Sequence, residues 1–311
     1  MVLRAVNLAR RVFPLSLIFT IRSAVVRAGI LRRHRHLAVV AEAKTAASPT
    51  ATLLWLDRVT AESSKEGSNS FDACLLLPGE GRAPDLHEVL SVLLASPRVQ
   101  SIAFYWDEAA LADDLPLWIA RADRLDPAAD ERGQIDAPSP AEVTAFLQRT
   151  HHAVTLPTAA LREAETLLKR LAGGGLAVCL NLPPDAGSLA GRLAAEFPLV
   201  RFFELSPAGA DAPGPPPNLV PLHSWGFSLH ERMALVRGAD VYIGRLDVLA
   251  AVAVMAGRPT VLLADPREEN GPREAGGGRV LWVPAETAAL VQGLRGFLDR
   301  LVATMPARIL L

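Results

Sequence analysis

Cysteine is scarce in this sequence, with only Cys74 and Cys179 in a chain of 311 residues. Both lie in apolar runs that are typical of buried strands. A disulfide framework is therefore not indicated, and we expect each cysteine to be buried as a small hydrophobic side chain. So little cysteine favours a reducing compartment, and we assign the chain to the cytoplasm.

Long apolar runs are also missing near the start of the chain. The longest, Val12–Ile21, has ten residues and includes Pro14, whereas a helix that spans a bilayer needs about 20. Arg22 and Arg27 follow it closely, where a secretory signal would carry the small residues of a cleavage site. We therefore predict neither a transmembrane helix nor a secretory signal here.

Acidic residues are absent from residues 1–41, although the whole chain has a net charge of −1. This segment carries +8 and the other 270 residues carry −9, because it contains Arg4, Arg10, Arg11, Arg22, Arg27, Arg32, Arg33 and Arg35. Three interpretations stay open: binding to an anionic membrane surface, packing on the acidic body as helices over 2–13 and 15–42, or organelle targeting. The acidic body predicts no nucleic-acid partner.

We divide the chain into three parts. Residues 1–42 form a basic amphipathic helical segment, residues 43–154 a reduced N-terminal α/β domain, and residues 155–311 a C-terminal Rossmann-like domain. In the second part, residues 43–70 are interpreted as a connector with one short helix. The strand, helix and strand expected after it cover 73–77, 85–96 and 99–106.

Helices and strands alternate regularly from residue 158 onward. The expected helices cover 158–171, 185–196, 228–237, 247–255 and 286–302. The expected strands cover 176–182, 199–205, 219–222, 240–243, 260–263 and 280–283, with a loop over 265–279. Three glycines from Gly173 stop the first helix, and Ser228 and Glu231 have the spacing of a capping box. This alternation predicts an α/β fold with a parallel sheet covered by helices on both faces.

Ligands of such sheets bind beyond the carboxyl ends of the strands. That rule selects candidates after each of the first five C-terminal strands, among them Asn181; Glu204 and Ser206; His223, Ser224 and Trp225; Gly244, Arg245 and Asp247; and Arg267 and Asn270. The turn from Gly244 to Asp247 starts a helix whose amides could hold a phosphate, with Arg245 adding charge. The other interpretation is an ordinary turn in which Asp247 caps the helix.

The N-terminal half offers fewer candidates. Glu80 lies in a glycine loop between a strand and a helix, without the Lys-Ser/Thr of a P-loop. Asp107 and Glu108 end a strand, where two carboxylates could bind Mg²⁺ or Mn²⁺, although a helix cap or a solvated turn is the simpler interpretation. We predict no metal site.

Residues 219–283 resemble the donor-binding half of GT-B glycosyltransferases, in particular the heptosyltransferase-like family. The matching segments are Ser228–Asp240, Val241–Gly244, Gly257–Leu263 and Asp265–Pro272, in the family's order and spacing. Where the family has Asp-Ser/Thr-Gly-Pro-x-His, this chain has Leu246–Ala251, so the Gly and His are absent and Asp247 is shifted by one place. The family's opening strand and glycine-rich acceptor loop also have no counterpart in our interpretation of the N-terminal half.

The resemblance implies a GT-B-like protein that binds a nucleotide-sugar as co-substrate, without a cofactor. It implies a glycan or lipid-linked acceptor and a role in cell-surface glycan or polysaccharide synthesis, on the inner face of the membrane. The donor-binding candidates are Asn181, Ser224, Gly244, Arg245, Asp247, Arg267 and Asn270. The candidates for a catalytic base are Asp107, Glu80 and His223. The alternatives are a non-catalytic scaffold derived from a glycosyltransferase, and a metal-dependent GT-A-like transferase using Asp107 and Glu108.

Overall fold

The chain divides into two compact units, Met1–Ile135 and Asp136–Leu311, and each is described by itself. The computed structural model describes residues 37–41, 49–65, 70–76, 86–106, 109–110, 124–125, 154–183, 189–206, 216–264, 273–275, 280–284 and 291–298.

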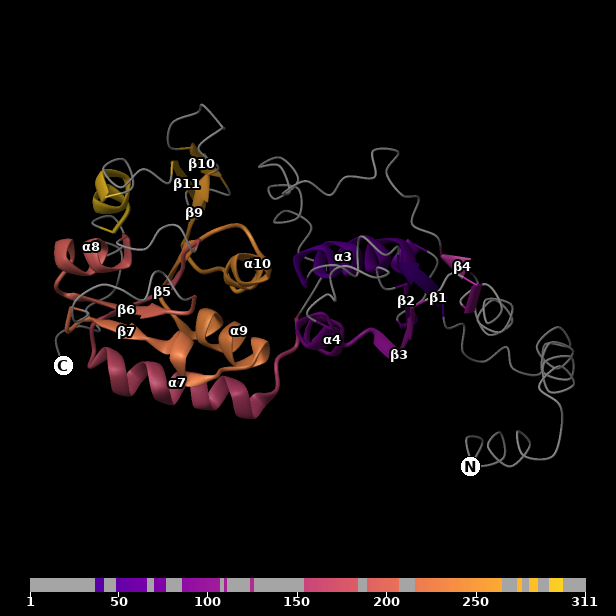
Figure 1. The fold of residues 1–311 in the computed structure, drawn as a ribbon. Coiled ribbons are helices and arrows are strands. Elements are labelled where there is room, and N and C mark those ends of the chain that lie inside the picture. Colours follow the sequence, from indigo (N-terminus) through magenta and orange to yellow (C-terminus); the bar gives the residue numbers. More distant parts are fainter. Residues whose placement is uncertain are drawn as a thin grey trace, which may run out of the picture. The chain divides into compact units, whose positions relative to one another are not determined.

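The N-terminal unit is built on a parallel sheet (Figure 1). Its strands β1 (Leu37–Ala41), β2 (Phe71–Leu76), β3 (Val99–Tyr105) and β4 (Arg124–Leu125) lie in the order β3-β2-β1-β4. Phe71 to Leu75 are all buried, as expected for a strand that is covered on both faces. The helices are α3 (Pro49–Lys65), between β1 and β2, and α4 (Leu86–Leu94), between β2 and β3.

Two predictions for this unit were wrong. Residues 37–41 form strand β1 in the middle of the sheet, whereas we had placed them at the end of a helix. The N-terminal half therefore does have an opening strand, which the sequence analysis had not found. The predicted connector contains α3, a helix of 17 residues, not one short helix. Hydroxyl side chains hide the periodicity of α3, because Thr52, Thr60 and Ser63 share its buried positions with leucine, tryptophan and valine.

The C-terminal unit has a larger sheet, in the order β10-β11-β9-β8-β5-β6-β7, in which only β10 runs antiparallel. Its strands are β5 (Leu176–Asn181), β6 (Val200–Glu204), β7 (Leu219–Pro221), β8 (Val241–Gly244), β9 (Thr260–Ala264), β10 (Arg273–Ala275) and β11 (Val280–Pro284). Counted along the chain, the parallel strands lie in the order 3-2-1-4-5-6 of doubly wound nucleotide-binding folds. The order reverses between β5 and β8, and ligands of such sheets bind at that point.

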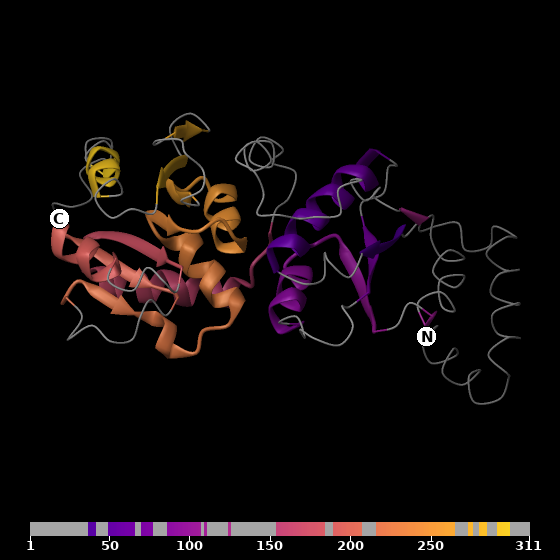
Figure 2. The same ribbon diagram turned by 45° about the horizontal axis from the view of Figure 1, so that its top comes forward.

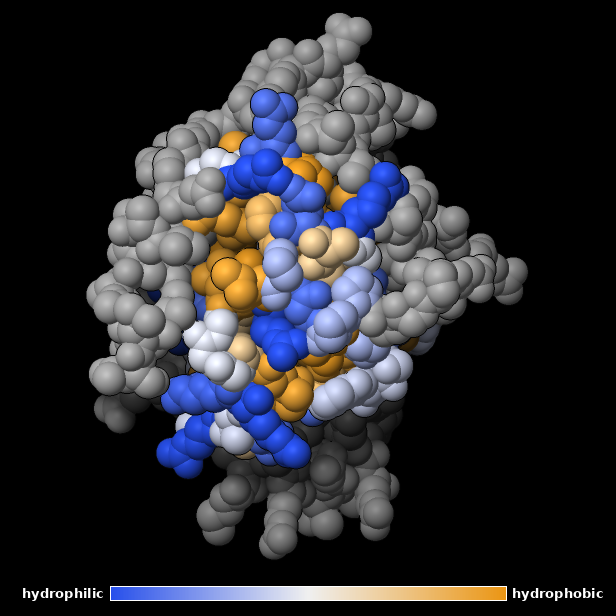
Figure 3. Space-filling view, turned by 90° about the vertical axis from the view of Figure 1, so that its left-hand side faces the viewer, coloured by the Kyte–Doolittle hydropathy of each residue, from blue (hydrophilic) through white to orange (hydrophobic). Residues whose placement is uncertain are grey.

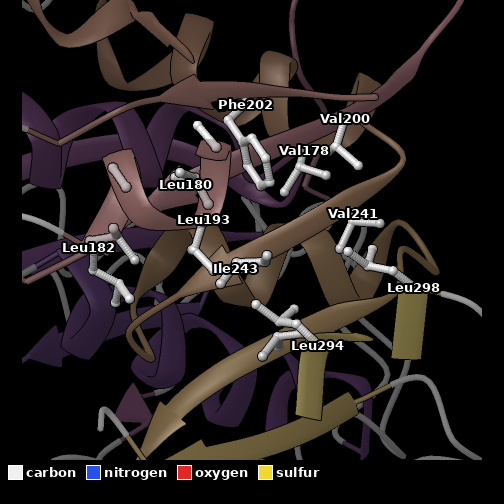
Figure 4. Close-up of a cluster of buried hydrophobic side chains, with 14 of the residues drawn as sticks. Val178, Leu180, Leu182, Leu193, Val200, Phe202, Val241, Ile243, Leu294 and Leu298 are labelled. Atoms are coloured by element: carbon white, nitrogen blue, oxygen red, sulfur yellow. The ribbon is translucent and has the colours of Figure 1, made fainter. Parts of the chain in front are cut away.

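Helices cover both faces of this sheet (Figure 2). On one face, α9 (Leu229–Gly238) contacts both α7 (Thr158–Ala172) and α10 (Val248–Met255). On the other, α8 (Leu189–Glu196) and the helix over 291–298 pack on a hydrophobic core. In that core, strand side chains such as Val178, Phe202 and Ile243 meet Leu193 and Leu294 (Figure 4).

The predicted C-terminal elements are confirmed with small shifts at their ends, and Gly173 ends α7 with a left-handed φ of 59°. Strand β10 was missed, because three residues within a polar loop carry no hydrophobic periodicity. The prediction of buried, unbridged cysteines is confirmed for Cys74 and Cys179. Burial also raises the pKa of the Cys179 thiol, so this side chain stays neutral.

The side of the C-terminal unit that carries α8 and β7 mixes hydrophobic and hydrophilic surface among its described residues (Figure 3). Strand β7 is the edge of the sheet, is only three residues long and ends at Pro221. Short edge strands with proline resist pairing with another chain. This edge is therefore a poor template for adding a further strand.

Candidate functional site

The carboxyl ends of β5 and β8 meet at the point where the strand order reverses. Asn181 ends β5 and is paired in register with Gly244, which ends β8. The amide of Arg245 then donates to the Asn181 carbonyl at 3.1 Å. The structure thus brings together four of the predicted donor-binding residues, which are Asn181, Gly244, Arg245 and Asp247.

Asp247 is the N-cap of α10. Its Oδ1 accepts hydrogen bonds from the amides of Leu249 at 2.9 Å and Ala250 at 3.1 Å. These are the free amides that a phosphate would use at the start of a helix. Of our two interpretations of this turn, the structure shows the cap, with the carboxylate of Asp247 in the place of an external anion.

Tyr242 joins this group from the inside of the sheet, where it is fully buried. Its hydroxyl accepts from Asn181 Nδ2 at 3.3 Å and lies 3.2 Å from both the Arg245 carbonyl and Asp247 Oδ1. Asn181 Nδ2 also donates to Asp247 Oδ2. Sequence reasoning missed Tyr242, although a tyrosine in a buried central strand needs a partner for its hydroxyl and so points to polar neighbours.

Burial sets the protonation of this cluster. Desolvation raises the pKa of Asp247, and the two backbone amides and the Arg245 guanidinium 3.5 Å away only partly oppose that rise. The pKa of Tyr242 is also raised, first by burial and then by the charge of Asp247. The tyrosine therefore stays a neutral hydrogen-bond donor.

Gly244 is required for this close approach. A Cβ at this position would lie 2.5 Å from the Asn181 carbonyl oxygen and 2.8 Å from the Tyr242 hydroxyl. Those distances are shorter than van der Waals contact with either atom, so a larger residue would push β5 and β8 apart. The glycine thus allows the carboxyl ends of β5 and β8 to pack closely together.

A second polar group lies at the ends of β6 and β7. Glu204 ends β6, is 5% exposed, and its Oε2 lies 3.5 Å from Nδ1 of His223. His223 and Ser224 belong to the 3₁₀ helix η3 (Leu222–Trp225), where the Ser224 hydroxyl donates to the Pro221 carbonyl at 3.0 Å. The next residue, Trp225, is half exposed.

The remaining sequence candidates lie outside the residues that the structure describes. These are Glu80, Asp107, Glu108, Arg267 and Asn270. Within the described ranges, no three His, Cys, Asp or Glu side chains gather as metal ligands would. Nor does any helix of those ranges have the length and hydrophobicity needed to cross a bilayer.

Comparison with known proteins finds no matching family model and no curated protein with a similar sequence. Solved structures do match. The crystal structure of a glycosyl transferase of family 9 from Veillonella parvula DSM 2008 is 8% identical, with a TM-score of 0.52 over 87% of this chain and 98% of that one. This likeness concerns the fold, and it extends well beyond residues 219–283.

Two further structures match with lower TM-scores. Heptosyltransferase WaaC from E. coli, with ADP-2-deoxy-2-fluoro heptose, is 13% identical over 85% of this chain and 99% of that one, with a TM-score of 0.42. A UDP-N-acetylglucosamine 2-epimerase from Listeria monocytogenes, described as putative, is 10% identical over 86% of this chain and 88% of that one, with a TM-score of 0.44.

Proposed function

From the GT-B-like α/β fold of this chain, we propose that it is a glycosyltransferase-like protein that binds a nucleotide-sugar. The observation that carries the proposal is the shared strand order 3-2-1-4 in both units, with Asn181, Gly244 and Arg245 at the carboxyl edge of the C-terminal sheet. We further propose that it acts in cell-surface glycan or polysaccharide synthesis on the inner face of the membrane, with a glycan or lipid-linked acceptor.

Arg245 is the residue that we assign to the diphosphate. Its side chain is 55% exposed, at the end of β8, and its Nε lies 3.5 Å from Asp247 Oδ2. Because Asp247 holds the first amides of α10, the charge of a bound diphosphate would rest mainly on this guanidinium. An arginine placed there would also stabilise the leaving diphosphate in a sugar transfer. Arg267 and Asn270 remain candidates for further donor contacts.

Calorimetric titration with UDP-, GDP- and ADP-sugars tests the donor site. We expect Arg245→Ala to weaken binding about tenfold or more, since a hydrogen bond to a charged group contributes about 1.5–3 kcal/mol. Arg258→Ala is the matched control, because Arg258 lies before β9, at the amino edge, and donates to the Arg237 carbonyl at 2.8 Å. If the intact chain binds none of these nucleotide-sugars, the proposal of a donor site is wrong.

The proposal includes no metal and no cofactor. We expect binding and transfer to be unchanged by Mn²⁺ or by a chelator, as the charge of the diphosphate is assigned to Arg245. A requirement for Mn²⁺ would instead support the GT-A-like alternative, with Asp107 and Glu108 as ligands.

A second candidate function is a non-catalytic scaffold that keeps the fold. The hydrogen bonds from the amides of Leu249 and Ala250 to Asp247 favour this function. The carboxylate occupies the amides that such a fold offers to a phosphate, and its negative charge repels a phosphate at the same position. Release of nucleoside diphosphate from a nucleotide-sugar in the presence of acceptor glycans would distinguish the two. Turnover would support the transferase, and binding without turnover would support the scaffold.

A further inference from the structure

Strand β3 is an edge strand whose own sequence lacks the features that usually protect one. Among the strands that the structure describes, it lies at the outer end of the N-terminal sheet, beside β2 (Figure 1). Proteins keep such edges from pairing with other chains by making them short or by placing charges or proline on them. Strand β3 has seven residues, VQSIAFY, and none of them is charged or a proline. It thus differs from β7, an edge strand of the C-terminal sheet, which has three residues and ends at Pro221.

The side chains of β3 are open to solvent. Every residue from Val99 to Tyr105 is at least partly exposed, whereas Phe71–Leu75 of the neighbouring β2 are buried. Because side chains alternate between the two faces of a strand, Ile102 and Phe104 lie on one face, and Trp106 is the next residue of that alternation. Trp106 is 60% exposed. An incompletely covered row of apolar side chains along a strand edge is typical of a surface that binds another chain.

A bulge limits the part of this edge that can pair. The register between β2 and β3 is interrupted at Gln100, which is an extra residue in β3. From Ser101 to Tyr105 the register is regular. The regular edge is therefore five residues long, and Ala103 is its centre.

We propose that β3 pairs antiparallel with β3 of a second copy of this chain, so that the two N-terminal sheets join into one. A two-fold axis that pairs the whole regular edge must pass through Ala103. It sets Ile102 opposite the partner's Phe104, and a β-branched side chain opposite an aromatic one stabilises a strand pair. No like charges meet, because the strand carries no charge.

This pairing also covers Trp106. Antiparallel strands place the amino end of one copy beside the carboxyl end of the other, so Trp106 lies diagonally across from the partner's Ile102. Diagonal neighbours on one face are about 7–8 Å apart, within the reach of an aromatic side chain. Leu94, which is 62% exposed, ends α4 shortly before β3 begins. The two large hydrophobic side chains that this unit exposes among its described residues thus lie toward opposite ends of β3, and the pairing brings both to each end of the joined strands.

A second copy is the occupant that this edge fits. The two-fold axis uses the same free edge in each copy, so the pairing closes as a dimer and does not continue into a fibre. At the opposite end of the N-terminal sheet, among the described strands, lies β4, which has only two residues. That end offers little for a further copy to pair with.

Sedimentation velocity of the intact chain over a range of concentrations tests this assignment. We expect a dimer of the unchanged protein and an affinity about tenfold or more weaker for Ala103→Lys, because the two added charges would lie opposite each other across the axis. Leu199→Lys is the matched control, since Leu199 is 89% exposed in the other unit, directly before β6. It should dimerise as the unchanged protein does. Circular dichroism checks that both variants keep their fold.

A disulfide between the two copies tests the register without adding charge. Opposite Cα atoms of antiparallel strands lie about 4.5–5.5 Å apart, a distance that a disulfide spans. With diamide as the oxidant, we expect Ala103→Cys to form a covalent dimer. Tyr105→Cys is its control, because the new thiol would lie opposite the partner's Ser101 and not opposite a second thiol. The native Cys74 and Cys179 are buried and do not compete.

Three results would overturn the assignment. The first is a monomer of the unchanged protein at every concentration, and the second is a dimer of Ala103→Lys as strong as that of the unchanged protein. The third is equal cross-linking of Ala103→Cys and Tyr105→Cys, which would place the axis elsewhere. The assignment does not rest on the proposed donor site, so titration with nucleotide-sugars succeeds or fails independently of it.

Discussion

The side chain of Asp247 controls the start of α10. It supplies the capping oxygen for two amides and, as a partly buried carboxylate, opposes any other anion at the same position. Its removal would leave the neighbouring donors satisfied: Asn181 Nδ2 would keep the Tyr242 hydroxyl at 3.3 Å, and that hydroxyl would keep the Arg245 carbonyl at 3.2 Å. Serine can therefore replace this aspartate without leaving a buried polar group unpaired.

We expect Asp247→Ser to raise the affinity for ADP or UDP about tenfold, through loss of the opposing charge, with the measurement made by calorimetry. Stability should fall by no more than about 1 kcal/mol, because serine is also a good N-cap. Asp240→Ser removes the same charge at the amino edge, where Asp240 accepts from the Ala177 amide at 2.9 Å, and should leave the affinity unchanged. Equal affinities in all three proteins would show that Asp247 does not restrict the site.

Gly244 gives a second test at this scale. Gly244→Ala should lower the free energy of unfolding by about 1–3 kcal/mol, the usual cost of overpacking, since the added methyl group overlaps Asn181 and Tyr242. Gly191→Ala is its control, as a Cβ on Gly191 in α8 would meet nothing within 4 Å. That control should gain up to about 1 kcal/mol from helix propensity. Urea unfolding measures both, and a neutral Gly244→Ala would contradict the packing argument.

The sequence allowed part of this site to be predicted. The rule that ligands bind beyond the carboxyl ends of strands selected Asn181, Gly244 and Asp247, which the structure brings together. It did not select Tyr242, because a side chain inside a strand looks like core until its neighbours are known. Nor could it decide whether the start of this helix binds a phosphate or is capped by Asp247, since both use the same backbone amides.

At the scale of elements, α9 starts with a complete capping box. The Glu231 amide donates to the Ser228 hydroxyl at 3.3 Å, and the Glu231 carboxylate accepts from the Ser228 amide at 2.7 Å. Hydrogen bonds from the Ser228 hydroxyl and then its amide lower the pKa of Glu231. This spacing was readable in the sequence, because both partners are local.

Ser228→Ala should therefore cost about 1 kcal/mol of stability at neutral pH. Since the pKa of Glu231 is lower in the folded state than in the unfolded one, its contribution is present at neutral pH. It is lost as the pH falls from the ordinary pKa of glutamate through the lowered one. The difference between Ser228→Ala and the unchanged protein should thus shrink in acid, measured by urea unfolding at several pH values. A constant difference would show that the charge of Glu231 takes no part.

Elements of the N-terminal unit were harder to predict. Strand β1 has five residues and only two β-branched ones, Val39 and Val40, so it gives little periodicity of its own. Its status as a strand comes from pairing with both β2 and β4, which lie far away in the sequence. Non-local pairing of this kind cannot be read from a short window.

For the whole molecule, the uneven charge is the property with the clearest consequence. We expect the eight arginines of residues 1–41 to bind anionic vesicles, since each contributes about 1 kcal/mol near such a surface. Flotation with phosphatidylglycerol vesicles should then be lost in a chain that lacks residues 1–36. Equal flotation of the intact and shortened chains would contradict the membrane interpretation.

The end point of that truncation matters. Removing residues 1–36 keeps β1, whereas removing 1–41 deletes a strand that pairs with β2 and β4 in the middle of the sheet. The longer truncation should unfold the N-terminal unit and broaden its amide signals. A loss of vesicle binding in that protein would therefore carry no information about the arginines.

The direction of β1 also fixes where the basic segment is attached. Because the sheet is parallel, residue 36 joins Leu37 at the end opposite to the one that Trp106 follows, and a strand of this length separates the two ends by about 16 Å. A protein tethered to a bilayer through this segment would be held by the far end of the N-terminal sheet. The carboxyl ends of its strands, where ligands of such sheets bind, would then be the ends farther from the point of attachment.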